Sequence, residues 1–100
     1  MPFTGWSDEE IIILVYYTSR GFKPSIVAEI LSRRQFSRSL ESIETMILEI
    51  VNDNPTLQVE PGLWDNQSVD QWIDALSLDH QTVSRLIQFT EADANMVEEV

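Results

Sequence analysis

Apolar residues recur at helical spacing along most of the chain, but between positions 11 and 17 the run Ile-Ile-Ile-Leu-Val-Tyr-Tyr is continuous. β-Branched and aromatic residues in such a run also suit a buried strand. We predict a helix, because Ser7 and Glu10 form a capping box just before it. Trp6 is placed as a hydrophobic staple, and Gly21 supplies a C-terminal stop. A helix that is apolar on most of its surface has to be covered on two sides, by the rest of the chain or by a partner.

Two more helices are predicted in the first half of the chain. Pro24 marks the beginning of the first, which should end near Arg33 and Arg34, where positive charge suits a helix C-terminus. Ser39 is the expected N-cap of the second. Helical spacing predicts that this helix buries five apolar residues: Leu40, Ile43, Met46, Ile47 and Ile50.

A connector should follow. Residues 56–60 alternate weakly, with Leu57 and Val59 apolar, which indicates an extended segment or a short strand. A turn is expected at residues 61–62, and Trp64 should anchor the loop.

Two or three further helices are predicted in the C-terminal half. Ser68 and Gln71 form a second capping box, which should open a fourth helix. Asp79 should cap a fifth helix, and Thr90 with Asp93 should open a last one. The apolar residues assigned to these last two helices are Val83, Leu86, Ile87, Phe89, Met96, Val97 and Val100.

The charge of the chain is strongly negative, at −11, with 17 acidic and 6 basic residues. The asymmetry is greatest in residues 52–100, which contain ten acidic residues and, of the basic ones, Arg85 alone. Such a surface repels phosphate backbones and anionic membranes and favours basic partners. Solubility alone is the simpler explanation of this composition.

The sequence offers little catalytic chemistry. It contains no cysteine and one histidine, which argues against disulfides and a zinc site and fits a reducing compartment. Asp70 and Asp74 are four residues apart, but no neighbouring feature would separate the pKa values of the two carboxyl groups, as acid–base catalysis requires. No apolar stretch approaches the roughly 20 residues that span a bilayer. We therefore predict a protein with no enzymatic activity, no cofactor, no metal and no membrane insertion.

Five features of the first half form a recognisable set: the Trp-Ser-Asp-Glu-Glu opening at residues 6–10, Leu14 eight residues after Trp6, the closing Gly21, the Val27-Ala28 pair, and Arg38-Ser39 before the third helix. Together they resemble the Myb/SANT-like family of homeodomain-like helix-turn-helix proteins. The resemblance implies an all-α fold, with a three-helix unit over residues 1–53. Residues 54–100 would form an acidic helical extension, packed on that unit as a single domain. The resemblance also implies an intracellular, nuclear setting that is related to chromatin or transcription.

The third helix bears on function, because it lies in the DNA major groove when such a fold binds DNA. Reading DNA requires Arg, Lys, Asn or Gln at base edges and further cations on phosphates. The outward face predicted here carries carboxylates and a leucine instead, as in SANT-type interaction modules. We hypothesise a protein–protein interaction module whose partner is basic or offers a hydrophobic helix. The residues predicted to bind it are Glu41, Glu44, Leu48, Glu49 and Trp64.

Two alternatives stay open. Arg33, Arg34 and Arg38 cluster at the turn before the third helix, where related folds often touch phosphate, so these residues could contact DNA or an acidic partner. Ordinary charge compensation at a helix end is the simpler explanation of the cluster. An acidic inhibitor that occupies the nucleic-acid-binding site of another protein is the second alternative. Homo-oligomerisation is undecided, because like charges oppose it and surplus apolar surface favours it.

Overall fold

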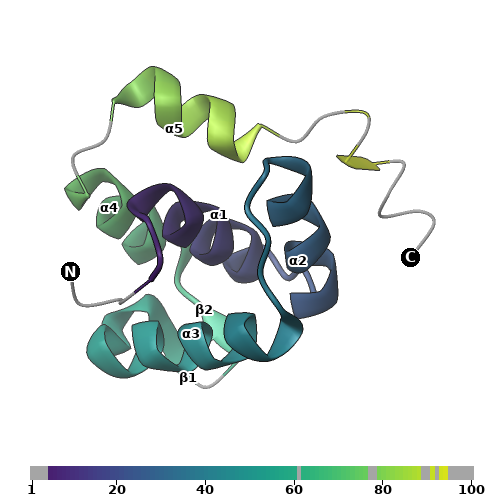
Figure 1. The fold of residues 1–100 in the computed structure, drawn as a ribbon. Helices are drawn as coiled ribbons and strands as arrows, with labels where there is room; N and C mark the ends of the chain where they lie inside the picture. Colours follow the sequence, from purple (N-terminus) through teal and green to yellow (C-terminus); the bar gives the residue numbers. More distant parts are fainter. Residues whose placement is uncertain (1–4, 61, 77–78, 89–90, 92, 95–100) are drawn as a thin grey trace.

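Figure 1 shows the fold in a computed structural model, which describes residues 5–60, 62–76, 79–88, 91 and 93–94. These residues form five α-helices and a short hairpin, which confirms the predicted all-α class. The order is α1 (Asp8–Ser19), α2 (Pro24–Arg33), α3 (Leu40–Asp53), a 3-10 turn (Pro55–Leu57), β1 (Gln58–Glu60), β2 (Leu63–Trp64), α4 (Asn66–Ala75) and α5 (His80–Ile87). Phe89, which was assigned to the fifth helix, lies outside the described residues, and so does most of the last predicted helix, with Thr90, Met96, Val97 and Val100.

α1 begins and ends where its capping residues predict. The Ser7 hydroxyl accepts from the backbone N–H of Glu10 at 3.2 Å, and the Glu10 carboxylate accepts from the backbone N–H of Ser7 at 3.1 Å. At the other end, the N–H of Phe22 donates to the carbonyl of Tyr17 at 3.2 Å. Gly21 makes this closure possible because it adopts a φ of 92°, which residues with a side chain disfavour. The continuous apolar run is therefore a helix.

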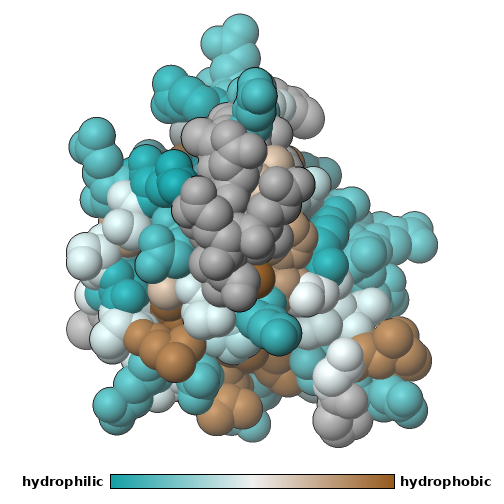
Figure 2. Space-filling model, turned by 90° about the vertical axis from the view of Figure 1, so that its right-hand side faces the viewer, coloured by the Kyte–Doolittle hydropathy of each residue, from teal (hydrophilic) through white to brown (hydrophobic). Residues whose placement is uncertain are grey.

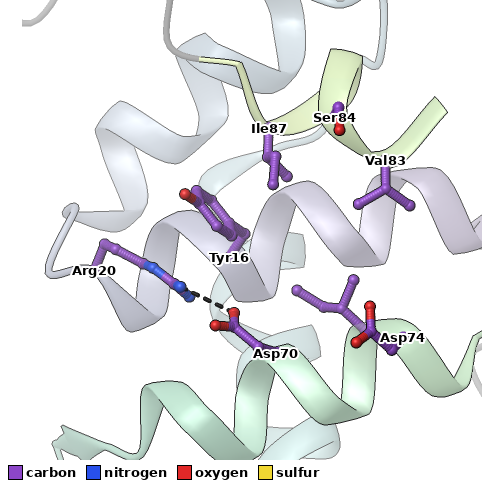
Figure 3. Close-up of a pocket in the computed structure, with 8 residues that line it drawn as sticks. Tyr16, Arg20, Asp70, Asp74, Val83, Ser84 and Ile87 are labelled. Atoms are coloured by element: carbon purple, nitrogen blue, oxygen red, sulfur yellow. Dashed lines mark hydrogen bonds and ion pairs between the residues drawn. The ribbon is translucent and has the colours of Figure 1, made fainter. Parts of the chain in front are cut away.

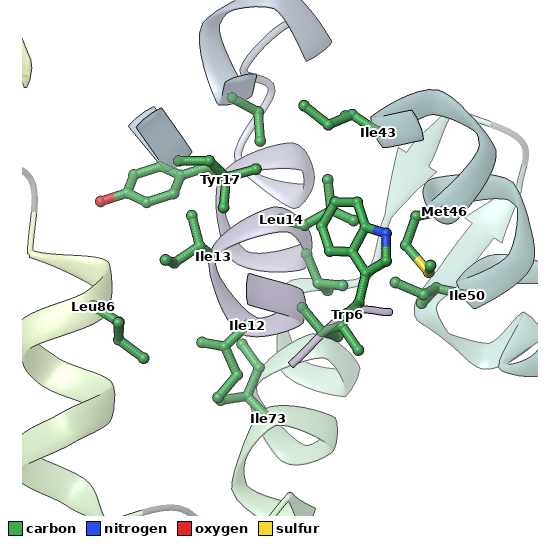
Figure 4. Close-up of a cluster of buried hydrophobic side chains, with 14 of the residues drawn as sticks. Trp6, Ile12, Ile13, Leu14, Tyr17, Ile43, Met46, Ile50, Ile73 and Leu86 are labelled. Carbon is green, nitrogen blue, oxygen red and sulfur yellow. The ribbon is translucent and has the colours of Figure 1, made fainter. Parts of the chain in front are cut away.

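α1 is also the centre of the fold. In Figure 1, α5 lies above it, α3 below, α2 to the right and α4 to the left, and α1 contacts all four. Ile12 and Leu14 are both fully buried. Figure 4 shows Leu14 beside Trp6 on one side of the helix and Ile12 against Ile73 of α4 on another. The chain's own C-terminal helices therefore cover the surplus apolar surface of α1.

α3 agrees with the prediction except at its first residue. Ser39 caps it, accepting from the backbone N–H of Ser42 at 3.1 Å. The prediction that Leu40 is buried is wrong, since this residue is 46% exposed. Side chains of a helix lean towards its N-terminus, so the first one projects past the end of the helix and away from the core. The residues that α3 does bury are Ile43, Met46 and Ile50, with Ile47 half-buried.

The connector after α3 contains a short strand, one of the two structures predicted for residues 56–60. β1 and β2 pair antiparallel, with Gln58 opposite Trp64. Leu57 is 1% exposed whereas Val59 is 69% exposed, although residues two apart in a strand would face the same way. The reason is that Leu57 belongs to the 3-10 turn and not to the strand, so the alternation of strand side chains between two faces does not apply to it.

The beginning of α4 is set by Asp65, and the predicted box at Ser68 is wrong. The Asp65 carboxylate accepts from the backbone N–H groups of Gln67 and Ser68 at 3.2 and 3.3 Å. Ser68 lies in the first turn and donates its hydroxyl to the same carboxylate at 3.0 Å. A carboxylate at this end of a helix also interacts favourably with the helix dipole. Asp79 caps α5 as predicted, accepting from the N–H of Thr82 at 3.2 Å.

Candidate interaction surface

The face of α3 that points away from the core carries three carboxylates and the large apolar side chain of Leu48. Glu41, Glu44 and Glu49 are exposed, and Leu48 is 71% exposed. The residues that α3 buries occupy the opposite side, so the helical period places these four side chains in solvent.

The hairpin exposes two further apolar side chains. Val59 is 69% exposed and Leu63 is 52% exposed. In the described part of the chain, every exposed large apolar residue belongs to α3 or to the hairpin. Figure 2 shows separate apolar side chains along the lower part of one face, at the height where Figure 1 has α3 and the hairpin. We call the α3–hairpin surface the set Glu41, Glu44, Leu48, Glu49, Val59 and Leu63.

Trp64 contributes less to this surface than the sequence suggested. It is half-buried in β2 and packs against the core, so it anchors the hairpin. The sequence reasoning missed Val59 and Leu63 as surface residues, because strands of two or three residues are too short to show which face is buried.

The three arginines near the turn between α2 and α3 have different surroundings. Arg33 is exposed, whereas Arg34 and Arg38 are half-buried and donate to partners elsewhere in the chain. A phosphate group would have to displace those partners in order to bind the two guanidinium groups. Of the predicted cluster, Arg33 alone is exposed.

Arg34 holds the C-terminal end of α5. Its Nε donates to the carbonyl of Leu86 at 2.8 Å and its Nη2 to that of Gln88 at 2.7 Å. The same Nη2 lies 2.9 Å from a carboxylate oxygen of Asp93, whose side chain is 2% exposed. Tyr17 adds a hydroxyl that donates to the carbonyl of Ile87 at 2.8 Å. Carbonyls at a helix C-terminus lack partners within the helix, and these contacts satisfy them. We call the α5 latch the side chains of Tyr17, Arg34 and Asp93.

We expect the free energy of unfolding to fall as the pH rises from about 10 towards about 12. Burial raises the pKa of Tyr17 to about 12 from its ordinary value of 10.0, although the positive charge of Arg34 opposes the shift. Because the folded-state pKa is the higher one, the neutral hydroxyl stabilises the fold fully below pH 10, and this contribution is lost above it. Urea unfolding at several pH values should show the decline in wild type and in Tyr16→Phe. The decline should be smaller in Tyr17→Phe, and an identical decline there would contradict the assignment.

Arg38 joins the turn before α3 to the beginning of α1. Its guanidinium group donates to the Glu10 carboxylate and to the carbonyl of Gly5, and lies 4.5 Å from the ring centre of Trp6. Burial alone would raise the pKa of Glu10, but hydrogen bonds from Arg38 and Ser7 outweigh it and hold that pKa below its usual value. The ionised carboxylate therefore stabilises the fold at neutral pH, and its contribution is lost as the pH falls through the lowered pKa.

Comparison of the chain with protein-family models, with curated proteins and with solved structures finds no match. Within the described ranges, no helix is long and apolar enough to cross a membrane. The same residues include no group of three or more His, Asp or Glu side chains that could hold a metal ion. Inferences about function therefore rest on the surface chemistry of the chain itself.

Proposed function

We propose that this protein is a non-catalytic protein–protein interaction module and that its α3–hairpin surface binds a protein partner. The observation that carries the proposal is the outer face of α3, where Leu48 is 71% exposed among three exposed glutamates. A large exposed apolar side chain surrounded by charged residues is typical of a surface that another protein covers. The carboxylates favour a basic partner, and the apolar side chains suit a hydrophobic helix.

The arrangement of the first three helices supports a Myb/SANT-like unit. α1, α2 and α3 pack on one another, and a turn of six residues separates α2 from α3. In a homeodomain-like arrangement α3 would be the element presented to the DNA major groove. Its outer face here would bring Glu41, Glu44 and Glu49 towards phosphate, which disfavours a DNA reader. A role in a chromatin or transcription-related complex in the nucleus is the corresponding proposal.

Replacing Leu48 with aspartate tests this proposal. We expect a partner that the immobilised wild-type protein retains from an extract of its native source to be retained at least tenfold less by Leu48→Asp. Truncation of a central apolar contact at a hot spot costs about 2 kcal/mol or more, and about 1.4 kcal/mol is tenfold. Ser25→Asp is the matched control, since it adds the same charge at an exposed position of α2. Both variants should unfold within about 0.5 kcal/mol of wild type.

Mass spectrometry of the retained proteins would measure the difference. Equal retention by wild type and Leu48→Asp would contradict the assignment of the surface. Equal loss with Ser25→Asp would show that charge alone governs the capture.

A further inference from the structure

A cleft lies away from the α3–hairpin surface. The cleft, of about 460 Å³, opens between α4 and α5, and α1 forms its floor (Figure 3). α4 and α5 each pack on α1, which leaves the space between them open. The apolar lining consists of Ile73, Val83 and Ile87, with Tyr16 beside them. Ile73 is buried and the other three are half-buried, so the lining is continuous with the core.

The guanidinium group of Arg20 lies in one part of the cleft. Arg20 lies 4.1 Å from the ring centre of Tyr16, and its Nη2 is 2.9 Å from a carboxylate oxygen of Asp70. Figure 3 shows this ion pair as a dashed line between Arg20 and Asp70. An aromatic face and a carboxylate together favour a cation. The pair is solvated, with side-chain exposures of 27% and 58%, so rearranging it costs little.

A second carboxylate lines the cleft without a cation of its own. Asp74 is exposed, stands one helical turn after Asp70, and forms no salt bridge within the described part of the chain. Like charges four residues apart on a helix repel each other, and Arg20 compensates only one of the two. A cation from another molecule would relieve this repulsion, whereas phosphate groups of nucleic acid or lipid would be repelled by it.

We infer that this cleft binds a basic, amphipathic segment of a partner protein. A lysine or arginine of that segment would pair with Asp74, and a neighbouring aliphatic side chain would pack on Ile73, Val83 and Ile87. The volume lies within the usual range of roughly 300–1,000 Å³ for binding pockets and accommodates a few side chains. The cleft uses α1, α4 and α5, so the inference stands whether or not the α3–hairpin surface binds a partner.

The test uses a synthetic helical peptide that is capped at both ends. Each of its lysine residues stands four positions from a leucine, so that both lie on one face of the helix. The peptide is titrated into the whole ¹⁵N-labelled protein. We expect amide shifts to change mainly around Tyr16, Ile73, Asp74 and Val83, with a dissociation constant below about 100 μM. Asp74→Asn should weaken binding about fivefold. Asp53→Asn, which removes the same charge from an exposed position at the end of α3, should change it less than twofold.

A second peptide, in which serine replaces each leucine at unchanged charge, should bind at least tenfold more weakly. Equal affinity of the two peptides, or equal weakening by Asp53→Asn, would overturn the inference, because attraction to a protein of charge −11 would then explain the binding. Shifts confined to α3 and the hairpin would also overturn it, while agreeing with the proposed function. Leu48→Asp should bind the peptide as wild type does, so failure of one proposal is distinguishable from failure of the other.

Discussion

Replacing Arg34 with methionine is expected to lower the free energy of unfolding by about 3–5 kcal/mol. The substitution would remove the guanidinium group that lies 2.9 Å from the carboxylate of Asp93, whose side chain is 2% exposed. It would also leave the carbonyls of Leu86 and Gln88 without their side-chain donor. Removing one member of a buried ion pair is costly because the remaining charge stays desolvated. Since small proteins are stable by only about 5–15 kcal/mol, the loss would be evident in urea unfolding.

Arg33→Met is the matched control for this experiment. The adjacent residue carries the same charge but is exposed, so we expect its replacement to change the free energy of unfolding by less than about 0.5 kcal/mol. A double variant, Arg34→Met with Asp93→Asn, should recover part of the loss, because the buried negative charge that Arg34 compensates would also be absent. If Arg34→Met were as stable as Arg33→Met, the α5 latch would contribute nothing, and Arg34 would be available to an external anion.

The second large effect is expected at Ile12, where alanine should lower the free energy of unfolding by about 2–5 kcal/mol. Ile12 is fully buried and packs against Ile73 of α4, so the substitution leaves a cavity between α1 and the C-terminal half. Leu14→Ala provides the comparison, because Leu14 is equally buried but lies beside Trp6, on the other side of α1. We expect the two losses to be of similar size.

The comparison tests whether the C-terminal helices are integral to the fold. If the three-helix unit were self-sufficient and α4 packed loosely on it, Ile12→Ala would cost less than about 1 kcal/mol while Leu14→Ala kept its full effect. Thermal or urea unfolding of both variants under the same conditions would measure the difference.

Features that depend on neighbouring residues could be predicted from the sequence. Ser7, Ser39 and Asp79 cap their helices through hydrogen bonds to residues three positions later. Both partners of each hydrogen bond are therefore visible in a short stretch of sequence. The same holds for Gly21, whose place after a long apolar run indicates a helix end. At Ser68 this reasoning failed, because Asp65 also lies within reach and caps the helix instead.

Features that depend on distant residues could not be predicted. The partners of Arg34 at the C-terminal end of α5 lie 52 and 54 residues away, and Glu10 lies 28 residues from Arg38. The arginines could therefore be predicted only as a local cluster. Likewise, the cleft beside Asp74 exists only because α4 and α5 meet α1. The exposure of Val59 depends on a 3-10 turn that interrupts the strand period, and no motif marks that turn.

The claim on which the functional proposal depends is that carboxylates rather than cations occupy the outer face of α3. Titration of labelled duplex DNA with the protein at roughly 50 mM salt tests it most directly, since low salt strengthens any contact between cations and phosphates. We expect no binding at micromolar protein concentration. Submicromolar binding that falls steeply as salt is raised, and that weakens in Arg33→Ala, would contradict the proposal and favour a DNA-binding domain.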